Sequence, residues 1–178
     1  MTINTALKIT ILWILFLASG FLHSDFKTFA SESDIENLCS FIAVEKAAAI
    51  LSLPVADLQK SHRELMVSPE DVKNKTYKQP PLSCSIRSKS NFLKMITYVI
   101  YVFNEPSHAQ VELRKMKTGF ETVSEVEMIK GMGEEAFWAG GKRFQRLVAR
   151  KNNKMIDVLS PKEFNFQADI MQMIMDKL

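Results

Sequence analysis

The sequence of 178 residues has few cysteines and little net charge, and these shortages exclude several classes of protein. Two cysteines are too few for a zinc site with four cysteine ligands or for a mini-protein held by several disulfides. The formal charge of +3 is too small for a dedicated nucleic-acid-binding protein, so we expect no nucleic acid as a partner. The chain contains no catalytic motif, and we expect no cofactor. Its 47% hydrophobic and 24% charged residues are typical of a single globular domain.

Residues 1–30 have the pattern of a secretory signal peptide. Lys8 precedes an apolar run over residues 9–17, and small residues follow that run. The run is about half the length of a membrane-spanning helix, which needs ~20 residues. Cleavage could follow Gly20 or Ala30, and we favour Ala30 because a polar segment would then begin the mature chain. The alternative is a segment that is retained and anchors the chain in a membrane.

The rest of the chain, residues 31–178, is predicted to form one domain in the periplasm or outside the cell. A bacterial lipoprotein carries a cysteine directly after the small residues of its leader, and Phe21 stands there instead. We therefore expect contact with a membrane only through a retained signal segment. Because the total charge is nearly neutral, it favours no particular electrostatic partner.

Cys39 and Cys84 both lie in the exported part of the chain. An even count with none left over predicts one disulfide in an oxidising compartment. The bridge would close a loop of about 46 residues, which the chain-entropy model values at roughly 4 kcal/mol. The alternative is a redox-active or nucleophilic thiol, but the sequence has no C-x-x-C motif and no histidine close to either cysteine.

Hydrophobic periodicity predicts an α+β domain in which three or four helices pack on an antiparallel sheet of about five strands. The helices are expected over 41–51, 106–119 and 161–177, with a weaker one over 55–66. The strands are expected over 82–87, 92–103, 143–150 and 155–159, with a short aromatic strand within 131–138. The polar residues 67–81 are expected to form an exposed loop, and residues 120–130 show only mixed alternation.

Three features of the chain resemble a loose group of small exported bacterial proteins, many of them actinobacterial lipoproteins. They are Leu38-Cys39-Ser40-Phe41 before an alanine-rich helix, Cys84 in a strand, and Gly-Met-Gly-Glu-Glu-Ala-Phe-Trp over 131–138. In that group a Gly-x-Gly-[Asp/Glu]-Glu-Ala-aromatic turn precedes the last hairpin. The resemblance covers nearly all of the mature chain and implies an α+β domain with a Cys39–Cys84 bridge outside the cytoplasm. It supplies no catalytic residues, and this chain lacks the group's lipidated cysteine.

A tryptophan and three arginines follow the turn marked by Gly131 and Gly133. We expect them to contact a ligand or partner, and they are Trp138, Arg143, Arg146 and Arg150. Arg146 and Arg150 share a strand face with Phe144 and Val148, so their cationic ends could flank an apolar strip. An anionic ligand, a polysaccharide or the edge of a protein would fit such a surface. The alternative is a solvated hairpin whose arginine stems cover the sheet.

The histidines of the mature chain, His62 and His108, stand apart from both cysteines, so we expect no metal site. Glu134 and Glu135 are neighbours on a strand and would point to opposite faces, which argues against an acid–base pair.

The sequence therefore predicts an exported, non-enzymatic domain that binds an envelope component, a partner protein or a small ligand. A secreted enzyme inhibitor is one alternative, although an inhibitor of a basic lysozyme would be acidic rather than slightly basic. A hydrolase whose site is assembled from scattered residues is the other, and the lack of a nucleophile motif speaks against it.

Overall fold

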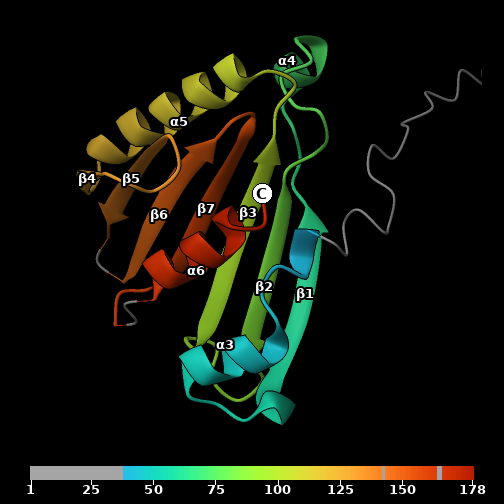
Figure 1. Ribbon diagram of the computed structural model, residues 1–178, viewed down its shortest axis with the longest axis vertical. Helices are drawn as coiled ribbons and strands as arrows, with labels where there is room; N and C mark the ends of the chain where they lie inside the picture. The colour runs from blue at the N-terminus through green and yellow to red at the C-terminus, as the bar shows by residue number, and fades with distance from the viewer. Residues whose placement is uncertain (1–37, 142, 164–165) are drawn as a thin grey trace, which may run out of the picture.

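The computed structural model describes residues 38–141, 143–163 and 166–178. The signal peptide predicted over residues 1–30 lies outside these residues. Within them the chain forms one antiparallel sheet of seven strands and four α-helices, as Figure 1 shows. The predicted α+β class is confirmed.

The seven strands lie side by side in the order β1-β2-β3-β7-β6-β5-β4. Each is hydrogen-bonded antiparallel to its neighbours. Their bounds are β1 Leu58–Glu64, β2 Leu82–Ser88, β3 Met95–Val102, β4 Glu125–Ile129, β5 Glu135–Gly140, β6 Phe144–Lys151 and β7 Lys154–Pro161.

Two antiparallel meanders, β1–β3 and β4–β7, meet where β3 pairs with β7 at the centre of the sheet. Helix α5, Pro106–Glu121, carries the chain from the end of β3 across one face to the far edge strand β4. The central strand β3 is rich in β-branched and aromatic residues, and alternate positions along it are buried. This agrees with the strand predicted over residues 92–103.

The prediction of about five strands was wrong by two, and both missed strands are edges of the sheet. Residues 55–66 were expected to form a weak helix, but they form the short 3₁₀ helix η1, Val55–Asp57, and then β1. Of the residues in β1 only Leu58 is buried, so the strand has no alternation of apolar side chains for a sequence pattern to detect. Residues 120–130 contain the other edge strand, β4, in which no residue is buried.

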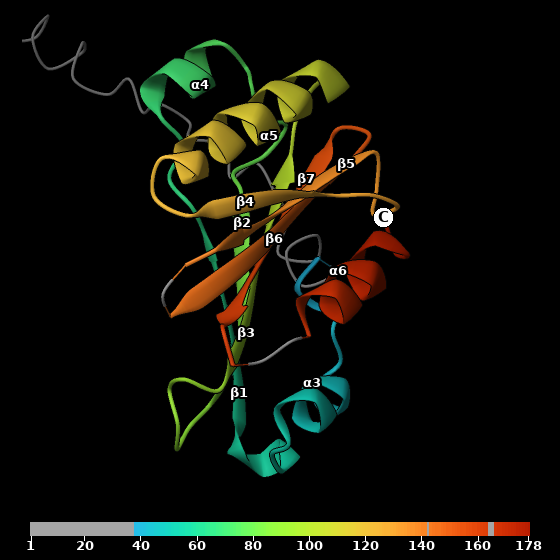
Figure 2. The ribbon, with the colours of Figure 1, turned by 90° about the vertical axis from the view of Figure 1, so that its left-hand side faces the viewer.

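The helices divide between the two faces of the sheet (Figure 2). Helices α3, Val44–Leu51, and α6, Gln167–Met175, lie on one face, and α5 lies on the other. The first face carries the larger core, with Ile96, Tyr98, Ile100, Ile156, Val158 and Ile170 among its buried side chains. The α5 face carries a smaller core of Phe103, Ala109, Leu113, Phe137, Ala139, Val148 and Met155.

Two helices begin later than predicted, and one short helix was not predicted. Helix α3 begins at Val44, later than the predicted residue 41, and its N-cap Ala43 makes no side-chain cap. Helix α6 begins at Gln167 because the residues expected to start it, Ser160 and Pro161, still belong to β7. In the loop predicted over residues 67–81, the short helix α4, Pro69–Lys73, is capped by the Ser68 hydroxyl, which accepts a hydrogen bond from the Asp71 amide at 3.1 Å.

Candidate functional site

The predicted disulfide is confirmed, and it fastens the segment before α3 to the second strand of the sheet. Cys39 and Cys84 are bonded with a Cα–Cα distance of 5.4 Å. The buried Tyr98 hydroxyl on β3 donates to the Cys39 carbonyl at 3.0 Å. From the other end of the chain, the Lys177 ammonium donates to the Phe41 carbonyl at 2.7 Å. The segment around the bridge is therefore held by one covalent bond and two distant hydrogen bonds.

A pocket of about 400 Å³ opens between this segment and the edge of the sheet. Its walls come from the disulfide segment, from β1 and from β2, through Cys39, Ser40, Lys60, Ser61, His62, Cys84, Ser85 and Ile86. None of these eight described residues is acidic, and two of them carry nitrogen-bearing side chains. Volumes of this size are typical of sites for small molecules.

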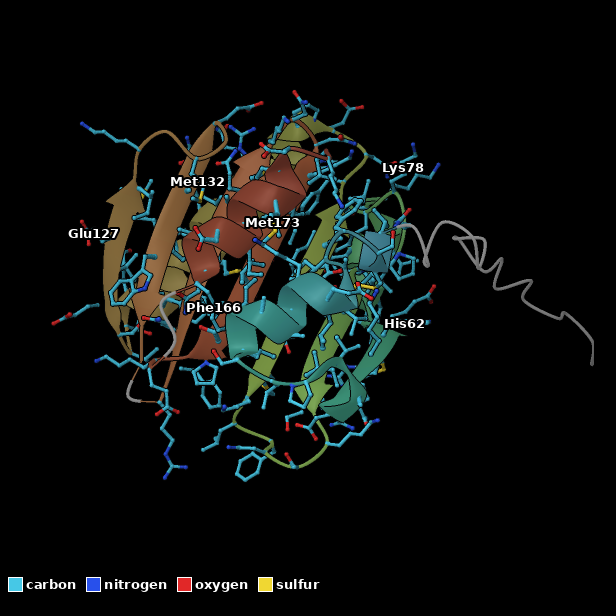
Figure 3. The ribbon with its side chains drawn as sticks, turned by 60° about the horizontal axis from the view of Figure 1, so that its bottom comes forward. His62, Lys78, Glu127, Met132, Phe166 and Met173 are labelled. Carbon is cyan, nitrogen blue, oxygen red and sulfur yellow. A yellow bond between two sulfur atoms is a disulfide. The ribbon has the colours of Figure 1, made fainter. Side chains whose placement is uncertain are left out.

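The strand register decides which side chains face the disulfide segment. Lys60 pairs with Ile86 and His62 pairs with Cys84, so all four lie on the face that carries the bridge. Figure 3 shows His62 beside the disulfide. The Ser85 hydroxyl points to the opposite face, where it is hydrogen-bonded to Thr97 at 3.1 Å.

This arrangement is suited to holding a small anion. The Lys60 ammonium supplies a positive charge and hydrogen-bond donors, and the His62 imidazole supplies a donor in either protonation state. The disulfide and the Ile86 side chain lie beneath them and are almost completely buried. Because the disulfide fixes the Cys39 segment that forms one wall of the pocket, this segment would not have to become ordered when a ligand binds.

The four residues predicted from the sequence do not form one surface. Trp138 pairs across the strands with Leu147, which places it on the α6 face. Arg146 and Arg150 lie on the opposite face, together with Val148 of the α5 core. Arg143 is exposed in the turn before β6.

Arg150 is buried and anchors the glycine-marked turn. Its guanidinium donates to the Glu134 carboxylate at 2.5 Å and lies 3.9 Å from that of Glu135. The Asn152 amide also donates to Glu134, at 2.8 Å. This backbone hydrogen bond, followed by Arg150, lowers the pKa of Glu134. The guanidinium of Arg150 therefore joins two turns of the fold, and its charge is already matched.

Arg146 pairs with a carboxylate that the sequence analysis did not single out. Its guanidinium donates to Asp157 Oδ2 at 3.0 Å and lies 5.2 Å from the centre of the Phe120 ring. Asp157 is buried, and within the described part of the chain its Oδ1 has no hydrogen-bond partner. Burial raises the pKa of Asp157 to about 6, although Arg146 acts in the opposite direction.

Lys60 and His62 were not predicted to line a pocket, and Asp157 was not predicted to be a buried acid. Lys60 and His62 were placed on a weak helix, which concealed that they face Cys84 and Ile86 across a strand pair. No sequence signal marks Asp157, because its burial depends on α5 packing over β7.

The described residues contain no group of three or more histidine, cysteine, aspartate or glutamate side chains arranged to hold a metal ion. Within the same ranges, no helix is long and apolar enough to cross a membrane.

No protein-family model matches the chain, and no curated protein matches it in sequence. Among solved structures, the extracellular domain of PknH from Mycobacterium tuberculosis is similar, with a TM-score of 0.52 and 12% sequence identity. That match covers 83% of this chain and 96% of the PknH domain. A GTP-binding regulator from Thermotoga maritima matches with a TM-score of 0.43 and 10% identity, over 75% of this chain and 84% of that one. At such low identity, the likeness to the PknH domain is one of fold alone: an α+β domain with one antiparallel sheet.

Proposed function

We propose that this chain is an exported, non-enzymatic binding domain whose pocket beside the Cys39–Cys84 disulfide takes a small anionic ligand. A disulfide persists in oxidising compartments, which supports a place outside the cytoplasm. The similarity of fold to an extracellular domain is in keeping with that place.

The pocket itself carries the proposal. It joins a cationic side chain, Lys60, to an imidazole, His62, above the apolar Ile86. The lining is mostly polar, with Lys60, His62 and three serines, and convergent polar groups are what orient a small ligand in its site. A ligand with a carboxylate or phosphate group would meet the positive charge of Lys60 without facing an acidic side chain of the pocket lining.

Binding is tested by titrating the ¹⁵N-labelled protein with citrate, inorganic phosphate and, as a neutral comparison, glucose. We expect the two anions to shift the amide resonances of Cys39, Ser40, Lys60, His62 and Cys84, and glucose to leave them in place. Lys60→Glu should abolish the shifts because it replaces the attracting charge by a repelling one.

Lys115→Glu provides the matched control. It makes the same change of charge on α5, at a side chain that is 67% exposed on the other face of the sheet. The proposed pocket is contradicted if Lys115→Glu weakens the shifts as much as Lys60→Glu does. It is also contradicted if the anions shift amides of other elements only.

A further inference from the structure

The turn between β2 and β3 is a second surface with an unusual composition. It spans residues 89–94 and lies at the same end of the molecule as η1, as Figures 1 and 2 both show. The Lys89 amide donates to the Asp57 carbonyl at 2.8 Å, so the turn and η1 are bonded to one another.

Side-chain hydrogen bonds fix the shape of this turn. The Ser88 hydroxyl donates to Asp57 Oδ2 at 2.6 Å and accepts from the amides of Ser90 at 3.1 Å and Asn91 at 2.8 Å. The Ser90 hydroxyl donates to the same carboxylate oxygen at 3.0 Å. These bonds, the one from Ser88 above all, lower the pKa of Asp57. The turn is therefore ordered by several bonds rather than left to fluctuate.

The ordered turn holds apolar side chains in solvent. Phe92 exposes 79% of its surface and Leu93 exposes 40%. On the adjoining η1, Val55 exposes 45%. Single exposed apolar residues are common, but here three gather at one end, and two are consecutive in a turn that is braced by hydrogen bonds.

Three basic residues lie in this turn or directly beside it. Arg87 and Lys89 are exposed and Lys94 is half-buried. The Lys89 ammonium donates to the Ala56 carbonyl at 2.7 Å, and that of Lys94 lies 3.5 Å from the Leu51 carbonyl. These two acceptors are neutral carbonyls, although Lys89 also interacts electrostatically with the Asp57 carboxylate. Three basic side chains against one carboxylate leave this end of the molecule with an excess of positive charge.

We propose that this end of the molecule, the β2–β3 turn with η1, docks on an anionic lipid bilayer. Phe92 and Leu93 would enter the boundary between headgroups and acyl chains, and Arg87, Lys89 and Lys94 would lie among the anionic headgroups. This contact is separate from the retained signal segment, the only route to a membrane that the sequence analysis foresaw.

The size of the apolar surface favours a bilayer over a protein partner. A stable protein interface buries about 800 Å² on each partner, and three partly exposed side chains offer far less apolar surface than its core requires. A bilayer requires only a few inserted side chains if basic residues are near, because each lysine or arginine at an anionic surface adds its own attraction.

Sedimentation with lipid vesicles tests the proposal on the exported form of the protein. The vesicles are pure phosphatidylcholine, or three parts phosphatidylcholine to one part phosphatidylglycerol. We expect wild type to sediment with the anionic vesicles and to be released by salt. The double variant Phe92→Ser, Leu93→Ser should bind them at least tenfold more weakly, roughly the loss expected from removing two apolar groups. Lys89→Glu should reduce binding to the anionic vesicles and leave any binding to the phosphatidylcholine vesicles unchanged.

Val123→Ser is the matched control, because Val123 is also 79% exposed but lies in the turn between α5 and β4. The Val123→Ser variant should bind the vesicles as wild type does. Because all variants have the same N-terminus, a difference in binding between them arises from the turn. Phe92→Trp adds a direct readout, since its fluorescence should shift to the blue and be quenched by brominated lipid. Wild type that stays in the supernatant overturns the proposal, and so does a Val123→Ser variant that loses as much binding as the double variant.

Discussion

Asp157 is the residue whose surroundings depart most from those of an ordinary surface carboxylate. It lies on β7 beneath α5, faced by Arg146 of β6 and close to the Tyr101 hydroxyl of β3. Arg146 satisfies one oxygen, and the other is buried without a partner in the described residues. The attraction of one guanidinium therefore offsets only part of the free-energy cost of removing this carboxylate from water.

The stability of the domain should therefore fall as pH rises through the titration of Asp157. Burial raises its folded-state pKa to about 6 from an ordinary value of 3.8, so the folded protein binds this proton more tightly than the unfolded chain does. The stabilisation from that proton is complete below the unfolded value and is lost by about pH 7, a change of roughly 3 kcal/mol at most. Urea unfolding of wild type and Asp157→Asn, at steps between about pH 4 and pH 7, measures it.

The variant with asparagine cannot titrate at this position and serves as the reference. Parallel stability curves for the two proteins would contradict the assignment, whereas a difference that grows in favour of the variant with rising pH would support it.

The two glycines of the glycine-marked turn, Gly131 and Gly133, have positive φ angles of 78° and 63°. They differ in their surroundings. A Cβ at Gly131 would meet nothing within 4 Å, whereas one at Gly133 would lie 2.4 Å from the Arg150 carbonyl oxygen. That carbonyl also accepts a hydrogen bond from the Glu134 amide at 2.8 Å, so it is not free to move away.

Gly133→Ala should consequently be much more destabilising than Gly131→Ala. The Gly131 variant incurs only the strain of a left-handed backbone, about 1–2 kcal/mol. The Gly133 variant incurs the same strain and, in addition, the clash with Arg150, which adds another ~1–3 kcal/mol. Thermal or urea unfolding of both variants gives the comparison, and equal losses would show that the turn can shift away from Arg150.

At the scale of elements, the disulfide connects parts of the chain that otherwise touch through few contacts. It joins the segment before α3 to β2, while Tyr98 of β3 and Lys177 near the C-terminus each bond to the same segment. Helix α3 packs beside β1 at the edge of the sheet, where the apolar surface available for packing is smallest.

Replacing both cysteines by alanine should lower the free energy of unfolding by about 4 kcal/mol, the chain-entropy value for a loop of this length. Urea unfolding of the double variant measures the loss, and reduced wild type should show a similar one. A double variant as stable as the oxidised protein would mean that Tyr98 and Lys177 hold the segment without the bridge.

For the chain as a whole we expect export, because disulfides form and persist in oxidising compartments. The intact mass of protein recovered from the periplasm of a Gram-negative expression host, with and without reduction and alkylation, tests this directly. We expect a mass that corresponds to cleavage after Gly20 or Ala30, with two thiols that react only after reduction. A full-length mass with free thiols would contradict export and return both cysteines to consideration as functional groups.

The elements that bury apolar side chains could be predicted from the residues alone, and so could the disulfide. The long strand β3 and the amphipathic α5 were predicted because burial leaves a periodic apolar pattern. The disulfide followed from the count of two cysteines in an exported chain.

The edges of the sheet, and the side chains that lie on each of its faces, depend on how the strands pair in the folded chain. Strands β1 and β4 form through backbone hydrogen bonds to one neighbour while their side chains stay mostly in solvent, so no apolar pattern marks them. Register then places Lys60 and His62 opposite Ile86 and Cys84, and separates Trp138 from the arginines of β6. Register depends on which strands pair and where, and a shift of one residue would turn each of these side chains to the other face.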